Sequence, residues 1–348
     1  MLMNRSVGVA LAAAALFGAS TPLAKLLVGE VPPLLLGGLL YLGSGLGLAL
    51  MRLWRERGWP ASGLPPHEWP WLAGAILFGG VLGPVALMFG LTQTSGSVAS
   101  LLLNLEAVLT AVLAWLVFKE NADRRVVLGM LAIVAGGVVL SWPTGQMAAS
   151  DGMGPAAIAL ACLCWAIDNN LTRKVSASDA LFIASTKGLI AGGVNTAMAL
   201  ALGLSWPDSP TLLGIMVVGL LGYGVSLVLF VVALRGLGAA RTGAYFSTAP
   251  FMGAAVAVVF LAETTSPTFW LASALMGLGV WLHLTERHAH EHTHEPLVHA
   301  HRHVHDAHHQ HAHEPTWDGT EPHSHQHAHL ALTHQHPHYP DIHHRHGH

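Results

Sequence analysis

Residues Phe17–Lys25 read FGASTPLAK, and residues Trp165–Arg173, 148 positions later, read WAIDNNLTR. Each stretch begins with an aromatic residue followed by a small one and ends on a basic residue. A second pair of stretches, Leu91–Glu120 and Leu234–Glu263, aligns at an offset of 143 residues and matches leucine, alanine and glutamate positions. Such self-similarity predicts an internal repeat.

Both copies of the repeat lie within long apolar stretches. The chain has 348 residues, of which 52% are apolar and 10% are charged, and its mean hydropathy is +0.50. This composition excludes an ordinary water-soluble domain. Windows of about 19 residues predict ten membrane-spanning helices. The predicted spans cover residues 6–28, 33–53, 70–91, 96–118, 124–142, 154–172, 178–203, 210–234, 240–262 and 267–285.

Five of these spans fall in each copy of the repeat. Because five is an odd number, the second copy must cross the membrane in the opposite sense to the first. The predicted fold is therefore an all-α membrane protein of ten transmembrane helices, built as two inverted five-helix repeats at residues 5–142 and 153–285, with a tail at residues 286–348. Inverted repeats of this kind predict two alternative openings of one central site.

The basic residues predict the orientation of the chain. If the N-terminus is cytoplasmic, the predicted outer loops hold no lysine or arginine, which is a strong positive-inside bias. We therefore expect a multi-pass protein of the plasma (inner) membrane with both termini in the cytoplasm. The basic residues on the inner side are then Arg5, Arg52, Arg55, Arg57, Lys119, Arg124, Arg125, Arg173, Lys174, Arg235, Arg241 and Arg287.

Ten spans and repeated helix starts are joined by a third feature, since the fourth helix of each half ends in Lys119-Glu120 or Ala262-Glu263. In these features the body of the chain resembles EamA-type transporters of the drug/metabolite transporter superfamily. The resemblance implies secondary transport of a small metabolite, with helices one to four and six to nine around the cavity. The family's fourth helix commonly carries a proline near its middle. Pro250 fills that place in the second half, but the first half has Ala107, preceded by Glu106.

Glu106 is predicted to lie about 13 to 14 Å into the fourth span, close to the middle of a hydrocarbon core about 30 Å thick. A carboxylate at that depth costs at least a few kcal/mol unless it is paired, hydrated or protonated. We expect Glu106 to carry the coupling proton of a transporter. The alternative is a neutral side chain that hydrogen-bonds between helices.

Lys187 is predicted to lie near the middle of the seventh span. Two roles are open for it. It could neutralise Glu106, or it could bind an anionic group of the substrate. Both roles place Lys187 on the transport pathway, and the alternative is that its ammonium group reaches towards the membrane surface.

Four further polar residues are predicted to line the pathway. Asp168 and Asn169 lie towards the cytoplasmic end of the sixth span, and Lys25 lies towards the outer end of the first span. At these depths a gating role competes with simple solvation. Asn104, like Asn195, could bind substrate or hold helices together, and holding helices together is the default for such residues.

The tail is predicted to be a disordered cytoplasmic segment, because it is too poor in apolar residues to form a packed core. Of the 25 histidines in the chain, 23 lie from His288 onward. Neutral imidazole binds zinc, nickel, cobalt and copper ions. The alternative is a solvated spacer. The predicted metal ligands are His288, His290, His292, His294, His299, His301, His303, His305, His323, His325, His327 and His329.

Several function classes are excluded or left open by the remaining residues. No motif for enzymatic catalysis is present, so we expect no enzyme and no required cofactor. The net charge of −3 and the absence of a basic patch argue against a nucleic-acid partner. The expected partners are the lipid bilayer, a small-molecule substrate and divalent metals at the tail, and a homodimer is left open. Two other functions remain, a carrier of transition-metal ions or metal chelates, and a non-transporting membrane anchor with a metal-buffering or sensing tail.

Overall fold

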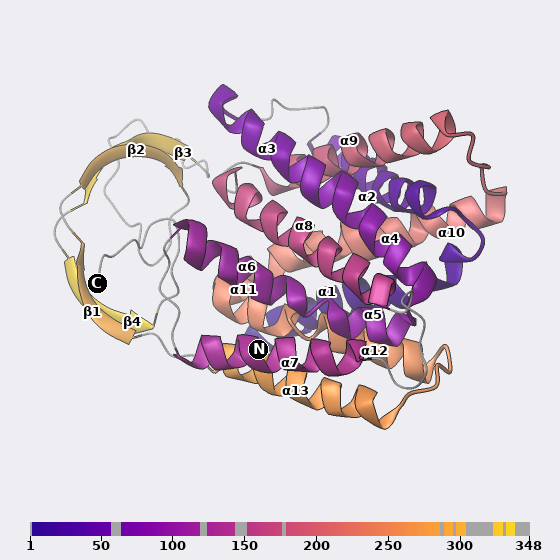
Figure 1. The fold of residues 1–348 in the computed structure, drawn as a ribbon. Coiled ribbons are helices and arrows are strands. Elements are labelled where there is room, and N and C mark those ends of the chain that lie inside the picture. Colours follow the sequence, from indigo (N-terminus) through magenta and orange to yellow (C-terminus); the bar gives the residue numbers. More distant parts are fainter. Residues whose placement is uncertain are drawn as a thin grey trace. The chain divides into compact units, whose positions relative to one another are not determined.

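A computed structural model of the chain describes residues 2–56, 64–118, 124–142, 152–175 and 179–285, and in the tail residues 289–294, 297–303, 323–329 and 332–337. The chain divides into two units, residues Met1–Glu286 and Arg287–His348. The first unit is a bundle of helices (Figure 1).

The first half of the bundle contains the helices up to the middle of the chain. They are α1 (Leu2–Val28), α2 (Pro33–Glu56), η1 (Pro66–Glu68), α3 (Trp69–Ala75), η2 (Ile76–Leu82), α4 (Gly83–Gln93), α5 (Gly96–Leu102), α6 (Leu105–Phe118) and α7 (Arg124–Ser141). The second half contains α8 (Met153–Val175), α9 (Ala180–Ala201), α10 (Ser209–Gly219), η4 (Leu220–Val225), α11 (Ser226–Phe246), α12 (Ala249–Val259) and α13 (Pro267–Leu284).

Polar residues mark the starts of several helices. The carboxylate of Asp179 accepts from the backbone N–H of Leu181 and begins α9, and the hydroxyl of Ser266 accepts from Phe269 and begins α13. These side chains satisfy backbone donors that have no partner within the helix. They therefore fix where each helix enters the apolar part of the bundle.

Six helical segments of the described residues are long and apolar enough to cross a membrane. They are Ser6–Val28, Pro33–Arg55, Pro66–Gln93, Gly96–Val117, Arg124–Ser141 and Ser209–Ala233. Two shorter apolar helices are Ala249–Val259 and Pro267–Leu282. The helices α8 and α9 have 23 and 22 residues, but both carry buried polar side chains that lower their apolar character. The protein is thus a multi-pass helical membrane protein.

The boundary predicted between the eighth and ninth spans differs from the structure. Residues 235–239 were expected to form a loop, but α11 continues through them to Phe246. Alanines 239 and 240 favour helix. The chain breaks instead at Ser247 and Thr248, and Pro250 then stands in the first turn of α12, where a missing N–H costs nothing.

The two halves share irregular features at equivalent positions. The third predicted span of each half contains a π-helical segment, η2 in the first half and η4 in the second. Gly79 in η2 and Gly222 in η4 are 143 residues apart, which is the offset of the sequence repeat. The fourth predicted span of each half is broken in its middle, between α5 and α6 and between α11 and α12. The repeat is therefore present in the backbone as well as in the sequence.

The second helices of the two halves, α2 and α9, pack backbone against backbone. A Cβ atom added to Gly45 would lie 2.6 Å from the carbonyl carbon of Gly188, and one added to Gly192 would lie 2.8 Å from the carbonyl oxygen of Gly38. As the residue numbers rise along α2, those of their partners fall along α9. The two helices therefore run antiparallel, and their small residues allow the close approach.

The fifth helices of the halves, α7 and α13, form a second contact of the same kind and lie side by side in Figure 1. A Cβ atom on Gly136 would lie 2.9 Å from the carbonyl oxygen of Ala272, and one on Gly279 would lie 2.6 Å from that of Gly129. These helices also run antiparallel. Equivalent helices of the two halves thus point in opposite directions at both contacts.

The described parts of the tail form four strands, β1 (Ala289–His294), β2 (Leu297–His303), β3 (His323–His329) and β4 (Leu332–Pro337). Strand β1 pairs antiparallel with β4, and β2 pairs antiparallel with β3. This differs from the prediction of a tail without regular structure. The physical reason lies in the alternation of histidine with other residues, since a period of two residues matches the pleat of a strand.

Candidate functional site

The sixth predicted span, α8, carries an ion pair with its neighbour α9. The ammonium nitrogen Nζ of Lys187 lies 2.5 Å from Oδ1 and 2.7 Å from Oδ2 of Asp168. The hydroxyl of Thr172, one turn further along α8, donates to Asp168 Oδ1 at 2.8 Å. The two charged side chains are only 18% and 10% exposed. Both carboxylate oxygens are thus occupied, and the two charges cancel within the bundle.

A second polar group lies on the α6 side of α8. The amide nitrogen Nδ2 of Asn169 donates to Glu106 Oε1 at 2.8 Å and lies 3.4 Å from Thr110 Oγ1. Glu106 stands in the first turn of α6, where the helix dipole favours a negative charge. Within the part of the chain that the structure describes, no basic side chain pairs with Glu106. A negative charge on Glu106 is therefore not neutralised by an ion pair with any described side chain.

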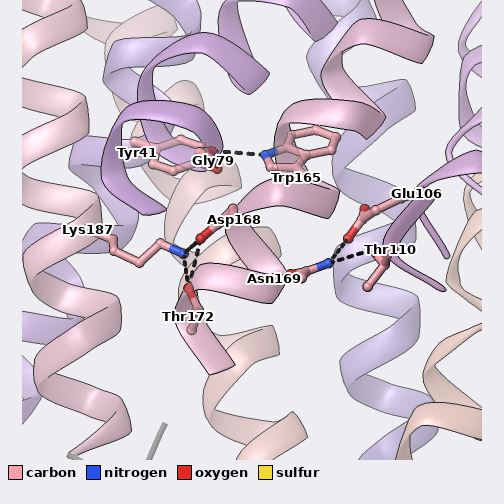
Figure 2. Close-up of polar contacts among 9 residues, drawn as sticks. All are labelled: Tyr41, Gly79, Glu106, Thr110, Trp165, Asp168, Asn169, Thr172 and Lys187. Atoms are coloured by element: carbon pink, nitrogen blue, oxygen red, sulfur yellow. Dashed lines mark hydrogen bonds and ion pairs between the residues drawn. The ribbon is translucent and has the colours of Figure 1, made fainter. Parts of the chain in front are cut away.

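Figure 2 shows how the neighbouring residues Asp168 and Asn169 leave α8 in different directions, towards Lys187 on one side and Glu106 on the other. Asn169 is exposed, whereas Asp168 is buried. Leu160, which is 53% exposed, lies nine residues before Asn169 and so about 180° around the helix from it. If the face of Leu160 meets lipid, the exposed surface of Asn169 faces the other helices, and the Glu106 group is reached from inside the bundle.

The π-helical segment η2 supports α8 at this level. The carbonyl oxygen of Gly79 accepts from Tyr41 Oη at 2.8 Å and from Trp165 Nε1 at 2.9 Å. A Cβ atom on Gly79 would collide with the side chain of Asp168. The glycine therefore makes room for the carboxylate, and the two aromatic donors occupy a carbonyl at the irregular turn. In Figure 2, Tyr41 and Trp165 lie on opposite sides of Gly79.

At the equivalent place in the other half, the described side chains form no ion pair. A Cβ atom on Gly222 of η4 would lie 2.5 Å from Cβ of Ser20 on α1. Ser20 and Asp168 occupy matching positions of the 148-residue repeat. The first half thus has a hydroxyl where the second half has a carboxylate. The two halves share their helix arrangement, but the charged side chains of the ion pair come from the second half.

Two of the predicted pathway residues bind backbone carbonyls at helix ends. Lys25 Nζ donates to the carbonyl oxygen of Leu91 near the end of α4, at 2.6 Å. Asn104 is buried in the break between α5 and α6, and its amide donates to the carbonyl oxygen of Leu101 at 2.8 Å. Asn195 likewise donates to Gly80 O at 3.2 Å. The bonds of Lys25 and Asn195 join distant segments of the chain, whereas the bond of Asn104 is local to the break.

The open question of the partner of Lys187 has a clear answer. Lys187 binds Asp168 rather than Glu106, so Glu106 is not neutralised by direct contact with it. The structure brings Glu106 together with Asn169, and Lys187 with Asp168, on two sides of one helix. The partners Thr110 and Thr172 were missed, although each follows an acidic residue on the same helix by four positions, a spacing that places them on one face.

Glu263 was noted only as part of a motif. Its two carboxylate oxygens accept from the backbone N–H groups of Gly96 and Ser97, each at 2.8 Å. Ala262 before it has a φ of 53°, in the left-handed region that a non-glycine residue rarely adopts. Glu263 therefore fastens the end of α12 to the start of α5. Its counterpart Glu120 lies outside the described residues.

The predicted metal ligands of the tail fall on the strands or outside the described residues. His299 pairs with His327 and His301 pairs with His325 in the register of β2 with β3, and His290 and His292 lie on β1 opposite histidines of β4. The others on strands are His294, His303, His323 and His329, and those outside the described residues are His288 and His305.

Comparisons with known proteins agree with this fold. The EamA-like transporter family model matches residues 4–142 and 152–285. An uncharacterized transporter of Methanothermobacter thermautotrophicus is 26% identical over 287 residues, which cover 76% of this chain and 82% of that protein. The uncharacterized transporter YetK of Bacillus subtilis is 28% identical over 139 residues, covering 39% of this chain and 42% of YetK. A crystal structure shares the fold with a TM-score of 0.60 at 20% identity, over 80% of this chain and 96% of its own.

Proposed function

Since the chain belongs to the EamA-like transporter family, as the resemblance in its sequence predicted, we propose that it is a secondary active transporter that moves a small metabolite across the plasma membrane by alternating access, coupled to protons through Glu106. The match is to a family of transporters and not of enzymes.

The observation that carries the proposal is the Glu106 group. Glu106 has no basic partner among the described residues and is hydrogen-bonded to the exposed amide of Asn169. A charged carboxylate inside an apolar bundle costs free energy unless it binds a proton or a cation. A proton is the smallest ligand that removes the charge. We therefore assign proton exchange to Glu106, and we assign the neighbouring Asn169 to substrate binding.

The antiparallel contacts support the alternating-access part of the proposal. Equivalent helices of the two halves run in opposite directions at α2 with α9 and at α7 with α13. An inverted repeat gives two mirrored states of one site, each open to one side of the membrane. We further propose ten spans with both termini in the cytoplasm, because that orientation places the basic loop residues inside.

Flux measurements in proteoliposomes test this function. The purified full chain is reconstituted into proteoliposomes and offered a panel of labelled metabolites. The vesicles are expected to accumulate at least one of these compounds when a pH gradient is imposed. This uptake should stop when a protonophore collapses the gradient. Liposomes without protein are the control. Flux that ignores the pH gradient for every transported compound would contradict proton coupling, and no flux of any compound would favour the membrane-anchor alternative.

The tail is proposed to bind transition-metal ions at the cytoplasmic side. The backbone register supports this, because histidine is paired with histidine in both ladders, as at His299 with His327 and His301 with His325. Residues opposite each other on antiparallel strands have Cβ atoms about 4.5–5.5 Å apart. Two neighbouring histidine pairs thus offer up to four imidazoles, the number that a tetrahedral zinc site uses.

Deleting residues 288–348 tests the role of the tail. The truncated chain is expected to lose most of its bound Zn²⁺ or Ni²⁺ in equilibrium dialysis at pH 7.5 while it keeps proton-driven flux. At pH 5.5 the full-length chain should also release metal, because protonated imidazole is no ligand. Retention of the metal by the truncated chain would place the binding site elsewhere.

The alternative of a metal-ion carrier has less support. Among the residues that the structure describes with their side chains, no group of three histidine, cysteine, aspartate or glutamate residues could hold a metal ion. The residues around Glu106 offer one carboxylate together with amide and hydroxyl oxygens. That donor set suits an organic substrate better than a transition metal, which prefers imidazole or thiolate ligands.

A further inference from the structure

The hydrogen-bonding groups beside Glu106 are unequally divided between donors and acceptors. Asn169 Nδ2 donates to Glu106 Oε1 and faces Thr110 Oγ1, so the amide donor is already in use. In the described part of the chain, Glu106 Oε2 and Asn169 Oδ1 accept no hydrogen bond. The unused capacity of this group therefore lies mainly in acceptors, beside the one O–H donor of Thr110.

The charges around α8 are also unequally divided. Lys187 binds both carboxylate oxygens of Asp168, so its positive charge is neutralised within the ion pair. Glu106 has no such partner in the part of the chain that is described. Among the side chains that the structure describes on this side of α8, the charge without an ion-pair partner is therefore that of Glu106, and it is negative.

We propose that the substrate of this site is an organic cation with a primary ammonium group, which binds between Glu106, Asn169 and Thr110. The inference rests on the proposed transport function and adds the chemical class of its cargo. A primary ammonium has three N–H donors, which match the carboxylate of Glu106, the amide oxygen of Asn169 and the hydroxyl of Thr110. The residues Glu106 and Thr110 share one face of α6, and Asn169 faces them from α8.

Binding of the cation exchanges it for the proton on Glu106. The O–H bond of the protonated carboxyl breaks, the proton passes to water, and the ammonium donates to the carboxylate that remains. No other bond changes, and the net charge of the occupied site is zero in both forms. Two further ligand classes are disfavoured by the same groups. An anion would meet Glu106, and a quaternary ammonium has no N–H to offer the free acceptors.

The experiment compares small probes of one chain length on the detergent-solubilised full chain. Butylammonium, butyltrimethylammonium and butyrate are titrated at pH 7.5, and binding is followed by the rise in thermal unfolding temperature. Butylammonium is expected to bind at least about tenfold more tightly than the other two, the difference that one charge-assisted hydrogen bond makes. It should also release a proton that is detectable in weakly buffered solution.

Two variants locate the binding site. Glu106→Gln should abolish both the stabilisation by butylammonium and the proton release, and Thr110→Val should weaken butylammonium while it leaves butyltrimethylammonium unchanged. Glu30→Gln, at an exposed turn outside the bundle, serves as the matched control. Unfolding of each variant without ligand shows whether it is folded.

Each outcome decides the inference separately from transport. Binding in detergent does not require transport. The titration therefore tests the cation assignment even if the protein does not couple transport to protons. Butyrate binding as tightly as butylammonium, or butylammonium binding that survives in the folded Glu106→Gln variant, would overturn the cation assignment. Proton-driven flux of a neutral or anionic metabolite would overturn it too while leaving the proposed carrier intact.

Discussion

Replacing Glu106 by glutamine is expected to lower proton-driven flux by about 10- to 100-fold, because a hydrogen bond to a charged group is worth about 1.5–3 kcal/mol and the amide cannot release a proton. Glutamine keeps the size of the side chain and can still accept from Asn169 Nδ2. The variant should therefore fold, and its residual flux should no longer respond to a pH gradient.

The measurement is initial-rate uptake into proteoliposomes at several external pH values. Glu106→Asp should keep a pH dependence at a reduced rate, since it retains a carboxyl about one methylene short of its place. If Glu106→Gln transports as fast as the unaltered chain and still follows the pH gradient, the carboxyl is a packing residue, and the proton is carried elsewhere.

Breaking the Asp168–Lys187 pair is expected to have the largest effect on stability. Lys187→Met leaves a carboxylate without its ammonium partner at a side chain only 10% exposed. Removing one partner of a buried pair typically costs about 3–5 kcal/mol. The thermal unfolding temperature of the variant in detergent should fall clearly below that of the unaltered chain.

A double variant separates the pair from its surroundings. Asp168→Asn together with Lys187→Met removes both charges and keeps a side chain of the right size against Gly79. Its stability should return most of the way, because neutralising both partners avoids an unpaired charge. A double variant that is as unstable as Lys187→Met alone would show that the pair is not what holds α8 to α9.

The sequence predicted the repeat well, because matching residues recur at a nearly constant offset between the two halves. The partner of Lys187 did not follow from the sequence. Lys187 and Asp168 lie 19 residues apart on different helices, and their contact depends on how α8 and α9 are rotated about their axes. Hydropathy measures the depth of a residue in a span and says nothing about that rotation.

The breaks in the fourth spans show the same limit. The break before α12 has a signal in Pro250, but the break at Leu103 and Asn104 lies in a stretch with neither glycine nor proline. There the amide of Asn104 turns back to the carbonyl of Leu101. Such a local bond competes with regular helix, and its outcome is decided by the packing around it.

The contact of α2 with α9 has a consequence for how the two halves of this chain change over time. Gly38 and Gly45 contact Gly188 and Gly192 with no side chain between them. A larger side chain in one copy of the ancestral duplication therefore requires a compensating change in the other copy. The two copies have little sequence left in common, yet along this seam they are not free to drift independently. Substitutions there should arise as compensating pairs, one from each copy.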